Sequence, residues 1–402
     1  MGAPTEAFRS RRVRELAALF FKLGTISFGG PAAHIALIES EVVRKRQWVT
    51  RQQFLDMLGA ANLIPGPTST EMAINVGFVH AGWIGLCVAG VSFILPAALI
   101  TGVFAWAYVH FGSLPQASGV LRGIKPAVVA VIALAICRLG KSAVKDSGLA
   151  ALGGLTLAAF FLEANPIAIL FGGGAIGMAV RMAASWRGGR AAVLSWLPVR
   201  LKPFALRRWT FARLLPAIAS IMIGSASPIR PSLSRMALYF LKVGAVLYGG
   251  GYVLLAFLEQ GLVQQHAWLT RQQLLDAVAI GQFTPGPVLS TATFIGYILG
   301  GVPGAAVATI GIFLPSFLYV ALLAPVLFRL RQSPWMAAFL DSVNVCAVML
   351  MAGVTSLLAM DALRTWASWI IALVSLGVLL RWKVNPAWVV LGGGVAGFVL
   401  FR

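Results

Sequence analysis

Two helix-breaking segments in the first half of this sequence have hydroxyl and imidazole side chains beside them. The first is a glycine pair within 24–31, and the second is a Pro-Gly-Pro triplet at 65–67. Proline and paired glycines end helices, and the next helix then offers free N–H groups and the positive end of its dipole. Such a helix start can bind a tetrahedral oxyanion. The candidate binding residues are Ser27, Gly29, Gly30, His34, Gly66, Thr68, Ser69 and Thr70, with breaks at Pro65 and Pro67.

The same arrangement recurs 220 positions later, with some substitutions. The second half supplies the candidates Gly249, Gly250, Gly286, Ser290 and Thr291, with breaks at Pro285 and Pro287. The alternative interpretation of one such motif is a glycine-rich helix crossing with capping hydroxyls. Because both breaks occur in both halves, we favour the binding site.

Four basic residues in apolar segments could supply charge for an anion. Lys22 and Lys242 each stand two residues before a repeated glycine. A charge inside a membrane is costly and usually functional or paired, so these lysines could together match a dianion. The alternative is that they extend to the membrane interface. Arg122 and Lys125 precede Pro126 and are candidate ligands or gate charges, or else a loop edge.

Five acidic residues are candidates for proton coupling. Glu39 and Asp56 recur as Glu259 and Asp276, whereas Glu71 has no acidic counterpart. Carboxylates within membrane segments can relay the protons that energise transport. The repeated acids could equally cap helices or pair with the repeated arginines at 51 and 271.

The composition decides the class of protein that must position these residues. Of 402 residues, 59% are hydrophobic and 11% are charged, whereas a soluble domain has about 25% charged residues. We therefore expect a polytopic membrane protein and exclude a soluble enzyme. The net charge of +20 fits basic cytoplasmic loops better than a nucleic-acid surface. No metal or cofactor is expected, because the three cysteines are isolated and there is no phosphate loop for ATP.

An internal repeat divides the chain. Residues 20–67 align without a gap on 240–287, with 18 of 48 positions identical, and the shift returns to 220 near the two ends. We predict an all-helical fold with one repeat over 1–184, a basic linker over 185–230 and a second repeat over 231–402. The predicted helices of the first repeat are 13–30, 33–46, 52–64, 67–80, 82–110, 116–138, 147–163 and 166–184.

The loop charges predict that the two repeats are inverted relative to each other. The first repeat is basic at 44–46, 138–145 and 181–190, where the second is poor in positive charge, and the second is basic at 329–331 and 381–383, where the first is not. Basic loops face the cytoplasm, so equivalent loops face opposite sides. The apolar run at 214–223 would then cross the membrane, which places the N-terminus in the cytoplasm and the C-terminus in the periplasm.

These motifs resemble the chromate ion transporter family in its long, two-domain form. The resemblance rests on the segment from Lys22 to Pro31 with His34, on 48–56 and on the triplet at 65–67, and the second copy fits at 242–250 and 268–287. Tyr248 and Gly251 depart from the first copy, so the second break is expected to be a gate or scaffold.

The resemblance implies a secondary transporter that exports chromate across the bacterial inner membrane and confers chromate resistance, with sulfate as the related dianion. We expect alternating access of two inverted halves around the dianion, and loss of export without loss of insertion in Lys22→Ala. The partners expected are this dianion and membrane lipid, without nucleic acid, and a homodimer is considered. The alternatives are a transporter of another anion or of lipid-linked phosphates, and a membrane-embedded lipid-modifying enzyme.

Overall fold

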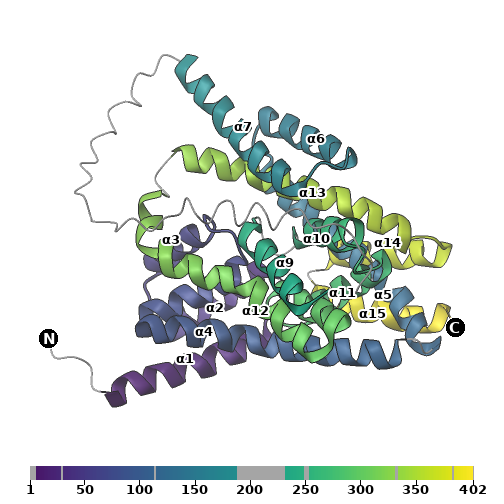
Figure 1. Ribbon diagram of the computed structural model, residues 1–402, viewed down its shortest axis with the longest axis horizontal. Helices are drawn as coiled ribbons and strands as arrows, with labels where there is room; N and C mark the ends of the chain where they lie inside the picture. The colour runs from purple at the N-terminus through teal and green to yellow at the C-terminus, as the bar shows by residue number, and fades with distance from the viewer. Residues whose placement is uncertain are drawn as a thin grey trace.

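The structure is a computed structural model, and it describes residues 6–28, 30–112, 115–187, 231–248, 253–330, 334–382 and 384–401. These residues are helical apart from short connections (Figure 1). The first half contains α1 (Glu6–Ile26), α2 (Pro31–Glu39), η1 (Ser40–Lys45), α3 (Arg51–Ala61), α4 (Thr68–Phe111), α5 (Pro115–Ala143), α6 (Ser147–Phe161) and α7 (Pro166–Arg187). The second half contains α9 (Leu233–Val246), α10 (Leu254–Leu258), η4 (Glu259–Gln265), α11 (Arg271–Phe283), η5 (Val288–Ser290), α12 (Thr291–Leu330), α13 (Pro334–Ala362), α14 (Trp366–Arg381) and α15 (Pro386–Leu400).

The sequence repeat is also a repeat of backbone conformation. Helices α3 and α11 each begin at a capping box, in which Thr50 or Thr270 bonds the residue three positions on and receives a reciprocal bond. Each of these helices follows a short π-helix, η1 or η4. The repeated Thr-Arg-Gln-Gln sequence is thus explained by helix capping, which satisfies otherwise free N–H groups.

A kink at the same place bends the long helix of each half. Gly82 in α4 has φ 63° and ψ −149°, and Gly301 in α12 has φ 63° and ψ −150°. A positive φ is readily adopted by glycine, so these two residues can turn the chain between two helices. We predicted separate helices over 67–80 and 82–110, and this division is confirmed, because residues 81 and 82 are non-helical and a Cβ at Gly77 would meet the backbone of Gly85, so the two parts of α4 fold back on each other. The predicted helix over 33–46 instead divides into α2 and the π-helix η1.

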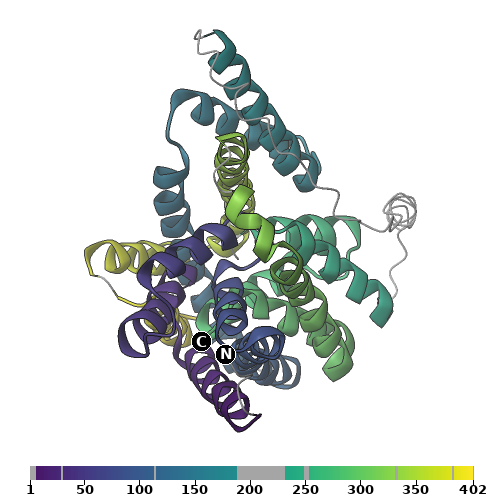
Figure 2. The ribbon, with the colours of Figure 1, turned by 90° about the vertical axis from the view of Figure 1, so that its left-hand side faces the viewer.

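The two halves interlock through their last helices. Helices α4 and α12 pack against each other, as do α5 and α13. Helices α6 and α7 of the first half then pack on α13, and α14 and α15 of the second half pack on α5. Figure 2, which looks along the long axis of Figure 1, shows α7 standing out from the main body beside α13.

Small residues allow the closest of these helix contacts. A Cβ added at Gly123 of α5 would meet the backbone of Gly393 and Gly397 in α15, and one at Gly177 of α7 would meet Ser342 of α13. Helices in membranes associate through such small-residue surfaces, because packing and not water exclusion holds them together.

The outer surface is apolar, as lipid contact requires. Five of the described helical segments are long and apolar enough to cross a membrane: 68–111, 119–143, 166–183, 288–322 and 335–362. Large apolar side chains such as Leu155, Trp366 and Trp388 point outward with more than half of their surface exposed. The chain is therefore a multi-pass membrane protein. The predicted crossing at 214–223 lies outside the described residues, as does most of the predicted linker.

Candidate functional site

Each helix break is held by a hydrogen bond from the other half of the chain. The Gly66 N–H donates to the Leu247 carbonyl at 2.7 Å, and the Gly286 N–H donates to the Ser27 carbonyl at 2.8 Å. Within the repeat, Gly66 is equivalent to Gly286, and Ser27 is equivalent to Leu247. The two bonds are therefore counterparts, and they bring breaks that lie far apart in the sequence into one place.

His34 organises the polar side chains of this meeting point. Its ring is 1% exposed, with Nε2 at 3.1 Å from the Ser27 carbonyl and Nδ1 at 3.3 Å from the Ser69 hydroxyl. A carbonyl oxygen can only accept, so in the neutral ring Nε2 carries the hydrogen and Nδ1 accepts from Ser69. The histidine thus links the end of α1 to the start of α4.

Several buried polar atoms around this link have no hydrogen-bond partner. They include the hydroxyl oxygens of Ser27, Thr70 and Ser316 and both carboxyl oxygens of Glu71. A Cβ added at Gly66 would lie against the Glu71 carboxyl and the Ser316 hydroxyl, so these groups gather beside the break. Buried polar groups are nearly always bonded, so a cluster of free ones marks a place for a ligand or water.

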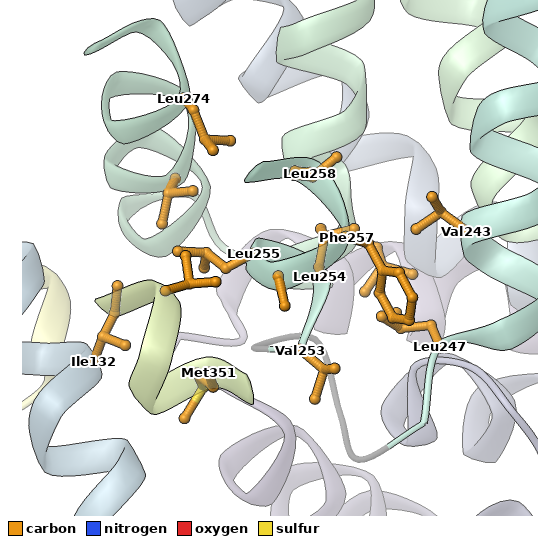
Figure 3. Close-up of a cluster of buried hydrophobic side chains, with 14 of the residues drawn as sticks. Ile132, Val243, Leu247, Val253, Leu254, Leu255, Phe257, Leu258, Leu274 and Met351 are labelled. Carbon is orange, nitrogen blue, oxygen red and sulfur yellow. The ribbon is translucent and has the colours of Figure 1, made fainter. Parts of the chain in front are cut away.

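The same place in the second half is apolar. Ser27, His34 and Ser69 correspond to Leu247, Leu254 and Leu289, all of which are buried. Figure 3 shows Leu247 and Leu254 among other leucine, valine and phenylalanine side chains of this cluster. Most of the polar site therefore comes from the first half, and the second half adds Ser316 together with this apolar cluster.

Hydroxyl groups from the second half complete a smaller polar contact. The Thr101 hydroxyl of α4 donates to the Ser290 hydroxyl at 3.2 Å. Thr291 instead donates to the Val288 carbonyl at the start of α12 and acts as a cap. Gly286 lies within this contact region, where an added Cβ would approach Ala97.

A cavity of about 1040 Å³ leads to the first-half break. Its inner lining includes Pro31, Gly66 and Thr68, and its outer part includes Arg138 and Lys145. An anion that enters past these basic side chains would reach the N-terminus of α4. The structure thus brings together, in or beside one site, the described candidates Ser27, Gly30, His34, Gly66, Thr68, Ser69, Thr70, Gly286 and Ser290, with the prolines of both triplets.

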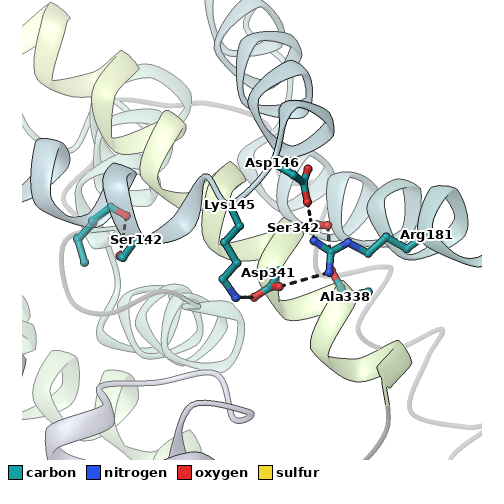
Figure 4. A network of polar contacts seen from close by, with 8 residues as sticks. Ser142, Lys145, Asp146, Arg181, Ala338, Asp341 and Ser342 are labelled. Carbon is teal, nitrogen blue, oxygen red and sulfur yellow. Dashed lines mark hydrogen bonds and ion pairs between the residues drawn. The ribbon is translucent and has the colours of Figure 1, made fainter. Parts of the chain in front are cut away.

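The mouth of this cavity carries a network of ion pairs. Lys145 Nζ lies 2.7 Å from Asp341 Oδ1, and Arg181 lies 2.8 Å from Asp146 and 3.6 Å from Asp341 (Figure 4). The Leu149 N–H, and next the Arg181 guanidinium, hold the pKa of the exposed Asp146 below its ordinary value. The network therefore joins α5, α6, α7 and α13 of both halves at this opening.

The two candidate lysines lie away from the polar cluster. The side chains of Lys22 and Lys242 are exposed. Lys22 interacts electrostatically with Glu41 of η1, and Lys242 with His266 at the end of η4. In this conformation neither lysine contributes to the buried site, and their role in anion binding stays a prediction. Gly29, Gly249 and Gly250 lie outside the described residues.

Arg122 and Lys125 line a second cavity of about 560 Å³, together with Arg271 and Arg364. Lys125 is buried and forms a 3.0 Å ion pair with Asp276, which also accepts a 2.9 Å hydrogen bond from Tyr108. We call Lys125, Asp276 and Tyr108 the buried triad. It ties α5 to α11 and α4 and is a barrier at the inner end of this cavity.

The predicted acids fall into two groups. Four have polar partners: Glu39 pairs with Arg44 at 3.7 Å, Asp56 accepts from Gln52 at 3.1 Å, Glu259 pairs with Arg271 at 2.9 Å, and Asp276 belongs to the buried triad. Glu71 is fully buried and has no partner for its carboxyl group among the described residues.

Two residues of the site were missed in the sequence. Ser316 and Thr101 lie on the long helices α12 and α4, in runs of apolar residues that carry no motif. The one available signal was the Leu-Pro pair that occurs in both halves. Ser316 follows the proline of this pair by one position, and Thr101 follows the equivalent proline by five positions. Among the described residues, no group of three His, Cys, Asp or Glu could hold a metal ion.

Comparison with known proteins agrees with the architecture. The sequence model of the chromate transporter family matches residues 14–178 and again 234–398. The chromate transport protein of Cupriavidus metallidurans is 33% identical over 97% of this chain and 93% of that protein. A probable chromate transport protein of Synechococcus elongatus is 31% identical, over 93% and 91%. An uncharacterized transporter of Methanocaldococcus jannaschii is 29% identical, over 95% and 92%. No solved structure matches the chain.

Proposed function

This chain belongs to the chromate transporter family, and from that premise we propose that it exports chromate from the cytoplasm across the inner membrane and so confers chromate resistance. Its two-repeat architecture and apolar surface are those of a membrane transporter and not of an enzyme. Sulfate, which has the same charge and tetrahedral shape, is the competing substrate that we expect.

The binding site in this proposal is the polar cluster of the first-half break. The observation that carries it is the set of buried hydroxyls without partners among the described residues, those of Ser27, Thr70 and Ser316, beside a break whose Gly66 and Thr68 line an open cavity. Each hydroxyl can donate a hydrogen bond to an oxyanion, and the start of α4 adds the positive end of a helix dipole. Tetrahedral oxyanions fit such a site because all four oxygens accept.

Inverted halves are the second part of the proposal. Trp48 of the first copy stacks on His80, and Asp276 of the second copy bonds Tyr108. His80 stands at the turn formed by Gly82, and Tyr108 stands near the far end of the helix that follows this turn, about 40 Å away at 1.5 Å per residue. The segments around Trp48 and Asp276 are equivalent in the repeat, so equivalent parts lie toward opposite membrane faces.

Alternating access follows from this arrangement. The wide cavity opens beside Arg138 and Lys145, residues of loops that are expected to face the cytoplasm. The opposite cavity ends at the buried triad. We infer that this conformation receives the anion from the cytoplasm and that release requires the triad to separate. Arg122 would then meet the departing anion on the far side.

Chromate flux in proteoliposomes tests the proposal. Purified protein should move radiolabelled chromate, and an excess of unlabelled sulfate should slow it more than phosphate does. The double variant Ser27→Ala/Ser69→Ala should lose most of this flux, while Ser356→Ala, at a hydroxyl outside the polar cluster, should keep it. Absence of flux in the wild type, or full flux in the first variant, would rule out this site.

A further inference from the structure

Glu71 is a carboxylic acid placed where an anion is expected to bind. It lies in the first turn of α4, is 0% exposed, and neither carboxyl oxygen has a hydrogen-bond partner within the part of the chain that the structure describes. It adjoins the break itself, because a Cβ at Gly66 would contact one of its oxygens. Other carboxylates of the chain that are buried, such as Glu259 and Asp276, have basic partners.

The groups that face Glu71 offer no compensating positive charge. The titratable side chains near it are Tyr248, before the second-half break, and Tyr319 of α12, both of which interact electrostatically with it. His34 of α2 has both ring nitrogens engaged by Ser27 and Ser69. Among the described residues no lysine or arginine pairs with it. An ionised carboxylate buried in this way is very costly, so the group holds a proton.

We propose that Glu71 carries a proton whenever the oxyanion occupies the site, releases it to the far side after the anion has left and takes up another from the first side, so that one proton and one dianion cross the membrane together and in the same direction. This inference rests on the proposed function and adds a second transported species to it. Its physical basis is that a dianion beside the carboxyl group makes ionisation still less favourable, because like charges repel. The transported unit then carries one negative charge and not two.

The protonated acid also sets a preference among oxyanions. A neutral Glu71 donates a hydrogen bond, as do the nearby hydroxyls of Ser27, Thr70 and Ser316. Hydroxyl and carboxyl groups that turn their hydrogens toward the anion favour anions without protons of their own, such as chromate and sulfate. Hydrogen phosphate carries an O–H group that needs an acceptor, and it would be disfavoured as long as Glu71 is protonated.

The number of charges moved per chromate tests the inference directly. In proteoliposomes at equal pH on both sides, with a tenfold chromate gradient and a potential set by potassium and valinomycin, net flux stops at a potential that depends on that number. One net charge gives about 59 mV and two give about 30 mV. We expect about 59 mV for the wild type, with a trapped pH dye reporting protons that move with chromate.

Two Glu→Gln variants assign the proton to its residue. In Glu71→Gln, net chromate flux should stop near 30 mV and the pH dye should report no protons, because the amide is neutral and carries no titrating proton. Glu15→Gln, at an exposed acid paired with Arg11, should balance near 59 mV. A wild-type balance near 30 mV, or a balance near 59 mV in Glu71→Gln, would overturn the proposal. No chromate flux at any potential would instead contradict the proposed function.

A conservative variant covers the case in which Glu71→Gln does not assemble. Glu71→Asp keeps the carboxyl group but withdraws it from Gly66 and Ser316. We expect it to keep the 59 mV balance and to change the pH at which chromate flux declines. If the pH dependence of chromate flux is unchanged in this variant, Glu71 does not carry the proton, whatever potential stops flux in the wild type.

Discussion

Gly66 occupies a position that only glycine fits. Its φ of 145° is strained for other residues, and a Cβ would collide with Glu71 and Ser316. We expect Gly66→Ala to reduce chromate flux at least tenfold while membrane insertion is retained. Gly154→Ala is the matched control, because a Cβ there meets nothing within 4 Å. Wild-type flux in Gly66→Ala would show that the break tolerates a side chain and is not the site.

His34 can be tested with the residue that the second half carries in its place. His34→Leu copies Leu254 and removes both of the histidine's hydrogen bonds, so that the Ser69 hydroxyl loses its partner and the Ser27 carbonyl keeps only the bond from the Gly286 N–H. Each buried unsatisfied group costs about 1–3 kcal/mol. We expect a lower unfolding temperature and strongly reduced chromate binding, both measured in detergent. His110→Leu, at an exposed ring near the end of α4, should leave binding unchanged.

The sequence identified which residue types gather at the site but not which way each one faces. The candidates beside the helix breaks were Ser27, His34, Ser69 and Glu71. These residues, close to a break in the sequence, also lie close to it in the structure. Lys22 stands equally near a break, yet its side chain is exposed, because its direction depends on how α1 packs against α4. Ser316 comes from the other half, and no local pattern announces such a contact.

Among the helices, the capping boxes make a separate prediction about stability. Thr270 bonds the Gln273 N–H at 3.2 Å and begins α11. Loss of such a cap costs about 1 kcal/mol, so Thr270→Ala should lower the unfolding temperature while chromate flux per folded molecule stays the same. Ser142→Ala, at an exposed hydroxyl outside the capping boxes, is the control and should melt as the wild type does. Equal melting of Thr270→Ala and the wild type would mean that the box does not stabilise α11.

The buried triad joins three helices and predicts a conformational response. Removing one member of a buried ion pair costs about 3–5 kcal/mol, whereas Lys125→Met with Asp276→Leu removes both charges together. We expect this double variant to open the cavity lined by Ser368. In a background without native cysteines, Ser368→Cys should then react faster with a maleimide that cannot cross membranes. An unchanged labelling rate would mean that the triad does not hold this side closed.

Helix positions were more predictable than helix continuity. The breaks near 30 and 65 follow from glycine and proline, and both were placed within a few residues. The π-helices were not foreseen, because a widened turn at 40–45 depends on packing and leaves the apolar pattern of the sequence unchanged.

At the scale of the whole molecule, inversion predicts where the two ends of the chain lie. Figure 1 shows α1 beginning at one end of the long axis and α15 finishing at the other. We expect a fluorescent reporter at the N-terminus to function in the cytoplasm and an alkaline phosphatase reporter at the C-terminus to be active in the periplasm. Both ends on the same side would exclude an inverted pair.

The membrane potential should drive export. A net negative charge gains about 2.3 kcal/mol for each 100 mV when it leaves a cell that is negative inside. Collapse of the potential with valinomycin and high external potassium should therefore slow chromate efflux from cells. A proton gradient directed inward should oppose efflux if Glu71 carries its proton along. A chromate efflux rate that does not depend on the membrane potential would indicate exchange against another anion.

The reciprocal bonds between the breaks also have a consequence for biosynthesis. Gly66 emerges from the ribosome about 180 residues before Leu247, the residue whose carbonyl it binds. At 5–20 residues per second the first break waits roughly 10–40 s for its partner. During that interval a glycine N–H and a carboxylic acid stand in a half-built membrane protein without their final surroundings. Until the second copy is synthesised, the insertion machinery, lipid headgroups or water must supply hydrogen bonds to these groups.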